Sequence, residues 1–250
     1  DQMSRIRTPY DLRKFGRPKA QRLMDDYIEH STLVHLAGAR GFNDHLIEWR
    51  VPLASHPKFS EIMVNRVKAP TRNRHLVAGA GAVGEVKANA GELVIASSDT
   101  LSMDVVDAVR SWMDQIPLPP PPVEFDEDLA ATDSPIRVLL ASPAQYSGFA
   151  TDPNFRAFQG NAMARARLAK DHPLFLGEAG LWNGILIIKM PKAIRFYAGD
   201  ELRYCASYTS EQESSVVVPA SFTDKYAVDR AILLGGQALG QAFGRSDHSG

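Results

Sequence analysis

The sequence predicts an α+β protein, on three observations. A long stretch, Tyr10–Ala37, carries apolar residues at helical spacing with charged residues on its other face. Stretches such as Ile136–Ala141 and Leu202–Tyr208 are short, apolar and typical of strands. Helical and strand patterns do not alternate regularly, so the repeated βαβ units of a doubly wound fold are not expected.

The first helix is expected to have a firm part at Lys19–Leu36. Gly16 and Pro18 should interrupt or kink it early, because proline lacks an N–H and clashes with the preceding turn. Gly38 and Gly41 should end it. This element is predicted to be a long amphipathic helix that is exposed on one side.

The next stretches alternate between irregular and regular structure. The prolines of Phe42–Asn89 favour loops and short strands. Leu101–Ile116 has one apolar face and predicts a second helix, with Ser102 and Asp104 suited to its N-terminus. The proline run within Pro117–Asp128 favours a stiff polyproline II spacer over a ligand for an SH3-type domain.

The second half is expected to hold a buried strand at Ile136–Ala141, followed by a helix that opens at Asp152 and Pro153. A hairpin-type turn is predicted at Ala198–Glu201. The last element, Ala227–Phe243, is apolar and predicts a buried helix or a helix–strand boundary. The strands predicted between these elements are Trp182–Met190, Ala193–Tyr197, Leu202–Tyr208 and Ser215–Val218.

Composition narrows the class of protein. The 250 residues are 44% hydrophobic and 23% charged, as in an ordinary globular chain, and the formal net charge is −1. The chain as a whole is therefore not attracted to nucleic acid or to an acidic membrane. No apolar run reaches the roughly 18 residues that a membrane span needs. The single cysteine, Cys205, excludes an internal disulfide and a cysteine-based metal site, and it is predicted to be a small core residue.

One glycine motif points to an enzyme. Gly79, Gly81 and Gly84 match the spacing of the dinucleotide-binding fingerprint, and Asp99 follows where a ribose ligand is expected. The fingerprint needs a buried strand before it and a long helix after it, and neither flank fits. A nucleotide-binding enzyme therefore stays the alternative function, while Gly79–Gly91 is expected to form a flexible loop.

The remaining motifs indicate no catalytic, cofactor or metal site. Gly235 and Gly240 have phosphate-loop spacing without its lysine, and with Gly236 they favour close packing of backbones. The histidines are scattered, without metal-ligand spacing. The basic helix that carries Arg156, Arg165 and Arg167 fits either phosphate contacts or a solvated, salt-bridged face; these two interpretations stay open.

Several short segments of the sequence occur together in the order that is known from one protein family. The chain resembles the major capsid proteins of tailed phages, in the N-four-like group, from RTPYDLR (Arg7–Arg13) to Gly244. The segments are NRVKAPTRNRH (Asn65–His75), LPPPPV (Leu118–Val123), VLLASPAQY (Val138–Tyr146), HPLFLGEAGLWNGILIIKMPKAIRF (His172–Phe196) and AVDRAILLGGQALGQAFG (Ala227–Gly244).

The resemblance implies the Hong Kong-type capsid fold. Lys19–Leu36 would be its spine helix, residues 1–100 would hold that helix and part of the peripheral (P) domain, and residues 101–250 would form mainly the axial (A) domain with returning P-domain elements. The N-terminal arm and the extended E-loop of the family are not expected in this chain.

The resemblance also implies a structural function without a cofactor. The chain would self-assemble into hexamers and pentamers of an icosahedral head in the host cytoplasm and enclose double-stranded DNA in the virion. Its partners would be other copies of itself, a portal protein, a scaffold, a decoration protein and packaged DNA, with no membrane. Gly235, Gly236 and Gly240 would pack at subunit contacts, and Arg156, Arg165 and Arg167 would face DNA nonspecifically.

Overall fold

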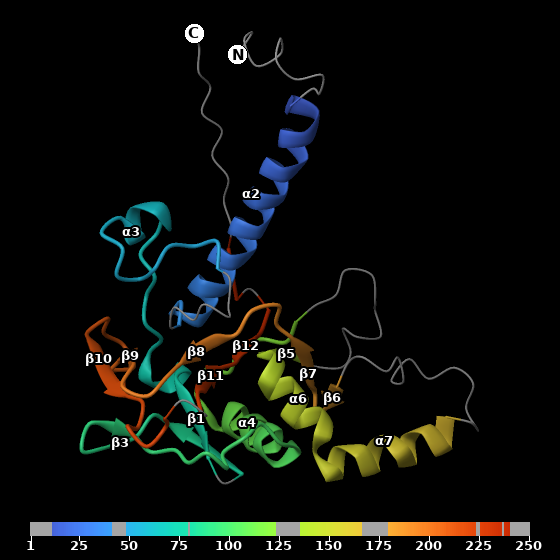
Figure 1. Ribbon diagram of the computed structural model, residues 1–250. Coiled ribbons are helices and arrows are strands. Elements are labelled where there is room, and N and C mark those ends of the chain that lie inside the picture. Colours follow the sequence, from blue (N-terminus) through green and yellow to red (C-terminus); the bar gives the residue numbers. More distant parts are fainter. Residues whose placement is uncertain are drawn as a thin grey trace. The chain divides into compact units, whose positions relative to one another are not determined.

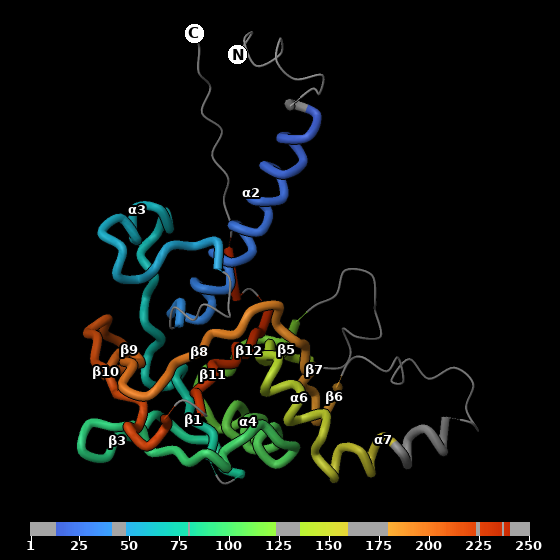
Figure 2. The backbone as a smooth tube through the Cα atoms, viewed as in Figure 1, coloured from blue at the N-terminus to red at the C-terminus, as the bar shows by residue number. Residues whose placement is uncertain are grey.

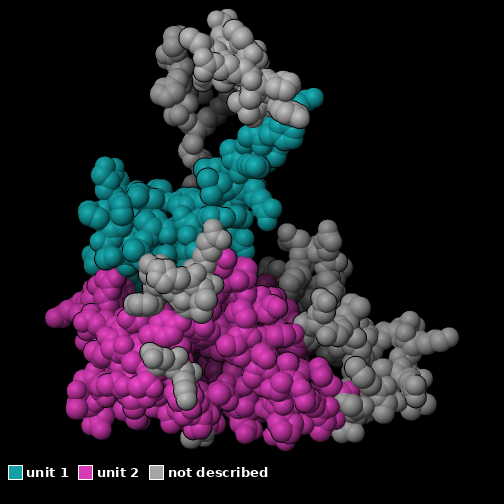
Figure 3. Space-filling model, viewed as in Figure 1, with its two compact units in different colours: residues 1–68 teal, residues 69–250 magenta. Residues whose placement is uncertain are grey.

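The computed structural model describes residues 12–41, 49–79, 81–123, 136–166, 180–223, 226–236 and 238–240. The chain divides into two compact units, Asp1–Lys68 and Ala69–Gly250 (Figure 3). Helices and strands are mixed along the chain without regular alternation (Figure 1), which confirms the predicted α+β class. The assignment of residues 1–100 and 101–250 to P and A domains stays a prediction.

The first unit is built on helix α2, Leu12–Ala37, which includes the predicted helix but begins well before it. The expectation that Gly16 and Pro18 would interrupt this helix is therefore wrong. Pro18 leaves the carbonyl of the preceding turn without a helical donor, but this part of α2 is exposed, so water can supply one. The helix ends as predicted, because Gly38 follows with a φ of 65° and donates its N–H to the carbonyl of His35.

The C-terminal part of α2 packs within the first unit. Val34 is fully buried and forms a small core with Val51 and Met63, whereas residues 14–25 are all exposed. Met63 directly follows the one-turn helix α3, Phe59–Ile62. Burial of apolar surface therefore stabilises the second half of α2 in this unit.

The second unit is centred on a four-stranded sheet with the order β12-β5-β7-β6 (Figure 1). β5, Arg137–Ala141, is the predicted buried strand and pairs parallel to β7, Ile185–Lys189. β12, Ile232–Leu234, and β6, Gly180–Trp182, pair antiparallel on either side. β5 is buried at four of its five positions, as its inner place in the sheet requires.

Helix α4, Met103–Gln115, confirms the second predicted helix. Its N-cap is Ser102, as expected, and the Ser102 Oγ accepts a hydrogen bond from the N–H of Val105 at 3.4 Å. The core of the unit joins α4 to the sheet and to the two helices that follow β5. Its buried members are Met103, Val106, Met113, Leu139, Ala141, Phe149, Phe155, Ile185 and Ile187.

Two helices follow β5 in the chain. α6, Pro143–Thr151, is not among the predicted elements, although Ser142 and Gln145 form a capping box that signals its start. α7, Pro153–Ala166, begins as predicted, since the Asp152 Oδ1 accepts the backbone N–H two residues further on at 2.8 Å. Both beginnings are set by local capping chemistry.

The remaining strands form a second four-stranded sheet and two antiparallel pairs. The sheet has the order β3-β4-β10-β9, with bounds Ala88–Asn89, Glu92–Leu93, Glu213–Val217 and Glu201–Cys205. The pairs are β1 with β2, Leu76–Gly79 and Ala82–Glu85, and β8 with β11, Ile194–Phe196 and Val228–Arg230. Figure 2 traces the chain from β8 into β9, which pairs with β10 in the other sheet.

Three predictions for the second half of the chain need correction. Trp182–Met190 is a hairpin of two strands, because Asn183 and Gly184 adopt positive φ values of 47° and 74° and form its turn. The turn at Ala198–Glu201 is present, but it joins strands of different sheets and makes no hairpin. Ala227–Phe243 is predicted to be a buried helix or a helix–strand boundary, but its described part contains strands β11 and β12 and no helix, because a short apolar run fits a buried strand as well as a helix.

Candidate functional site

The glycines of the dinucleotide fingerprint lie in the β1–β2 hairpin. Gly79 ends β1, Gly84 belongs to β2, and Gly81 lies between them with a φ of 74°. A dinucleotide site needs a helix whose N-terminus faces the pyrophosphate, whereas an antiparallel strand follows here. Asp99 accepts the N–H of Ala96 at 2.8 Å. The expected loop is therefore partly a hairpin, and this geometry does not favour nucleotide binding.

Gly235 and Gly236 pack against the proline segment, which we define as Leu118–Val123. A Cβ on Gly235 would lie 2.4 Å from the Pro121 carbonyl oxygen, and a Cβ on Gly236 would lie 2.5 Å from that of Pro122. The Gly236 N–H also donates to the Pro121 carbonyl at 2.8 Å. The close packing predicted for these two glycines is thus found inside the chain.

Arginine side chains hold the same proline segment. The Nε of Arg137 donates to the carbonyl of Pro120 at 2.8 Å, and the Nη2 of Arg74 donates to that of Leu118 at 2.8 Å. The segment is therefore fixed along its length rather than presented as a free ligand. Gly240 has no atom within 4 Å of an added Cβ. The place of all three glycines at subunit contacts stays a prediction.

A buried polar network is centred on Asp229. Its carboxylate accepts the Ser142 hydroxyl at 2.5 Å and two N–H groups of Arg195 at 2.7 and 2.9 Å. The Gln145 side chain donates to the Asp229 carbonyl at 2.7 Å. The hydrogen bond to Asp229 raises the pKa of Arg195 further above its usual range. Because the carboxylate faces arginine rather than histidine, it does not activate Ser142 as a nucleophile, and the network ties α6 to the β8–β11 pair.

A second buried pair joins His75 and Arg230. The Nη2 of Arg230 lies 3.1 Å from the Nε2 of His75, and its guanidinium lies 5.3 Å from the ring centre of Phe196. Burial, and then the nearby Arg230 charge, lower the pKa of His75 to about 3, while burial lowers the pKa of Arg230 to about 10. A histidine with so low a pKa is a poor general base at neutral pH.

The sequence-predicted DNA contacts are described only in part. Arg156 lies on α7, is exposed, and donates from its Nε to the Ala150 carbonyl at 3.2 Å. Arg165 belongs to α7, but its side chain lies outside the described residues, as does Arg167 entirely. Cys205 is buried, as predicted. A shared surface of these three arginines stays a prediction.

Two further kinds of site are missing from the described part of the chain. No group of three or more His, Cys, Asp or Glu side chains there could hold a metal ion. Among the same residues, no helix combines the length and apolar character needed to cross a membrane.

Sequence reasoning missed both buried networks. Asp229 lies 87 residues from Ser142, and Arg230 lies 155 residues from His75, so no local pattern links the partners. The capping box at Ser142 and Gln145 was the one readable signal.

Two comparisons with known proteins give a match, and both are to phage capsid proteins. A family model described as "Phage capsid protein" matches residues 1–250. The structure resembles the solved capsid of Ralstonia phage GP4, with a TM-score of 0.56, 20% sequence identity, and coverage of 93% of this chain and 54% of the other. This chain therefore spans about half the length of that one, and the likeness shows a common fold. No curated protein matches significantly. The chain belongs to the phage capsid protein family.

Proposed function

We propose that this chain is the major capsid protein of a tailed phage. Copies of it would assemble into hexamers and pentamers of an icosahedral head around double-stranded DNA. The family match over residues 1–250 carries the proposal. Membership of this family makes the chain a structural protein of the virion capsid. The buried networks support this function, because they stabilise the fold and present no activated nucleophile or base.

The proposal includes the partners of a phage head. A portal protein, a scaffold and a decoration protein would join copies of this chain during assembly in the host cytoplasm. Packaged DNA would be met nonspecifically through Arg156, Arg165 and Arg167, since the formal net charge of −1 leaves attraction to DNA to local basic patches. A net charge near zero also limits repulsion between the many copies of a shell.

Electron microscopy of negatively stained full-length protein tests the proposal. The protein would be expressed alone and with a scaffold, and rings or closed shells are expected. A strictly monomeric protein under every condition would contradict the proposal. Calorimetry with NAD or NADP tests the alternative, since a saturable heat that disappears in Gly81→Val would favour a nucleotide-binding enzyme.

A further inference from the structure

Val64 is an exposed valine in a backbone conformation that valine rarely adopts. Its φ is 66°, and its side chain is 81% exposed. It directly follows Met63, the C-cap of α3, at a position where glycine is the usual residue because it has no Cβ. The isolated chain therefore gains nothing from valine here, since the residue strains the backbone and exposes apolar surface to water.

The two residues before Val64 are held in place by contacts within the first unit. Met63 is 1% exposed and belongs to the core of the first unit, and the Tyr27 hydroxyl donates to the carbonyl of Ile62. Ile62 itself is 39% exposed. We call the segment Lys58–Lys68 the Val64 knob. It carries three basic residues, Lys58, Arg66 and Lys68, and one acidic residue, Glu61.

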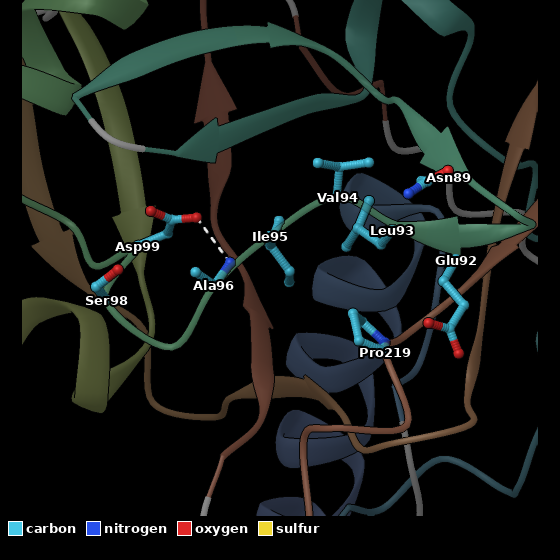
Figure 4. Close-up of a pocket in the computed structure, with 9 residues that line it drawn as sticks. All are labelled: Asn89, Glu92, Leu93, Val94, Ile95, Ala96, Ser98, Asp99 and Pro219. Carbon is cyan, nitrogen blue, oxygen red and sulfur yellow. Dashed lines mark hydrogen bonds between the residues drawn. The ribbon is translucent and has the colours of Figure 1, made fainter.

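A groove of about 520 Å³ in the second unit has the complementary character (Figure 4). Its apolar part includes Val94, Ile95 and Pro219, and Val94 is 55% exposed. Glu92 and Asp99 also line it, and none of its lining residues is basic. Figure 4 shows the apolar side chains between Asp99 at one end and Glu92 at the other.

We propose that the Val64 knob of one copy packs into this groove of a neighbouring copy, with Val64 against Val94. The contact would bury two exposed valines and would place a basic segment beside two acidic residues. It joins two different surfaces, and such heterologous contacts form closed rings when the rotation between neighbouring copies closes. An open groove with a half-exposed valine suits a protruding side chain better than a small ligand, which pockets largely enclose. The inference rests on the proposed self-assembly.

Disulfide trapping in assembled shells tests the contact. Val64→Cys and Val94→Cys would be combined in a Cys205→Ala background, which removes the natural buried thiol. Oxidation is expected to give a ladder of covalent oligomers on a non-reducing gel, because each copy links to the next. Each single variant should stay monomeric on the gel, and so should Val64→Cys with Leu118→Cys, which places the second thiol at another exposed position.

The outcomes of this cross-linking experiment test the contact separately from the proposed capsid function. Shells that form but give no ladder, or only links within one chain, overturn the contact and leave the capsid function intact. A natural protein that never assembles overturns both.

The variant Val64→Asn tests the same contact independently of cross-linking. Asparagine tolerates a positive φ and is polar, so the unassembled variant should unfold at a higher urea concentration than the natural chain. The subunit concentration at which shells appear should rise about tenfold, as expected for one valine side chain that is no longer buried. Higher stability with unchanged assembly would show that Val64 has a local role alone.

Discussion

At the scale of single residues, His75 shows how burial sets the charge of a side chain. The residue is 7% exposed, and its Nδ1 has no hydrogen-bond partner among the described residues. Its Nε2 lies 3.1 Å from the Arg230 guanidinium. Protonation would place a second cation in the same buried space, so the histidine stays neutral and links the stability of the fold to pH.

The pH dependence from His75 has a definite sign. The folded pKa of about 3 lies below the ordinary value of 6.5, so the unfolded chain takes up a proton first as the pH falls. The stability from neutral His75 is complete above about pH 6.5 and is lost as the pH falls toward 3. At pH 5 the loss in free energy of unfolding is about 2 kcal/mol.

Urea unfolding at pH 7 and pH 5 measures this loss. The free energy of unfolding should fall less between these values in His75→Gln than in the natural chain, by about 2 kcal/mol. Equal losses in the two proteins would contradict the assignment of the effect to His75.

At the scale of elements, the proline segment packs against the residues at the end of β12. It follows α4 in the chain and leads toward β5, and it contacts the glycines that come directly after β12. Only residues without a Cβ permit this approach at Gly235 and Gly236. The spacer predicted from composition is therefore also a packed element.

Gly235→Ala should destabilise the chain by about 1–3 kcal/mol, because its new Cβ meets backbone atoms that cannot move aside. The nearest of them, the Pro121 carbonyl oxygen, would be 2.4 Å away. Gly84→Ala is the matched control, since nothing lies within 4 Å of its Cβ. Thermal or urea unfolding measures both variants, and an equal effect at the two sites would contradict the packing.

At the scale of the whole molecule, the chain is nearly neutral and belongs to a family of capsid proteins. Contact with DNA would therefore depend on where the basic side chains gather rather than on net charge. The described residues place Arg156 on an exposed part of α7, in the helix where sequence analysis predicted a basic surface.

The pair Arg165→Glu and Arg167→Glu should reduce the amount of full-length genome packaged by assembled heads, since it replaces phosphate attraction with repulsion. The DNA content of purified particles measures this. Lys87→Glu, a change of the same kind at another exposed position, serves as the control. Normal packaging by the arginine variant would remove these residues from the DNA-facing surface.

Local patterns predicted the elements whose starts depend on their own residues. Ser102 and Asp152 cap α4 and α7 as expected, and the apolar run at Ile136–Ala141 is an inner strand. The turn at Asn183–Gly184 also carries a readable signal, because the pair Asn-Gly is typical of two-residue hairpin turns. Ala227–Phe243 had none, because its apolar run fits either a helix or a strand until β5 and β8 supply pairing partners.

The sequence by itself determined the α+β class, the main helices, the burial of Cys205 and the resemblance to phage capsid proteins. These depend on composition, short-range periodicity and ordered segments, all of which can be read along the chain. The tertiary structure alone decided which distant residues meet, such as Asp229 with Ser142 and His75 with Arg230. Such partners are chosen by packing through space, where pairing a buried charge or polar group outweighs any local preference.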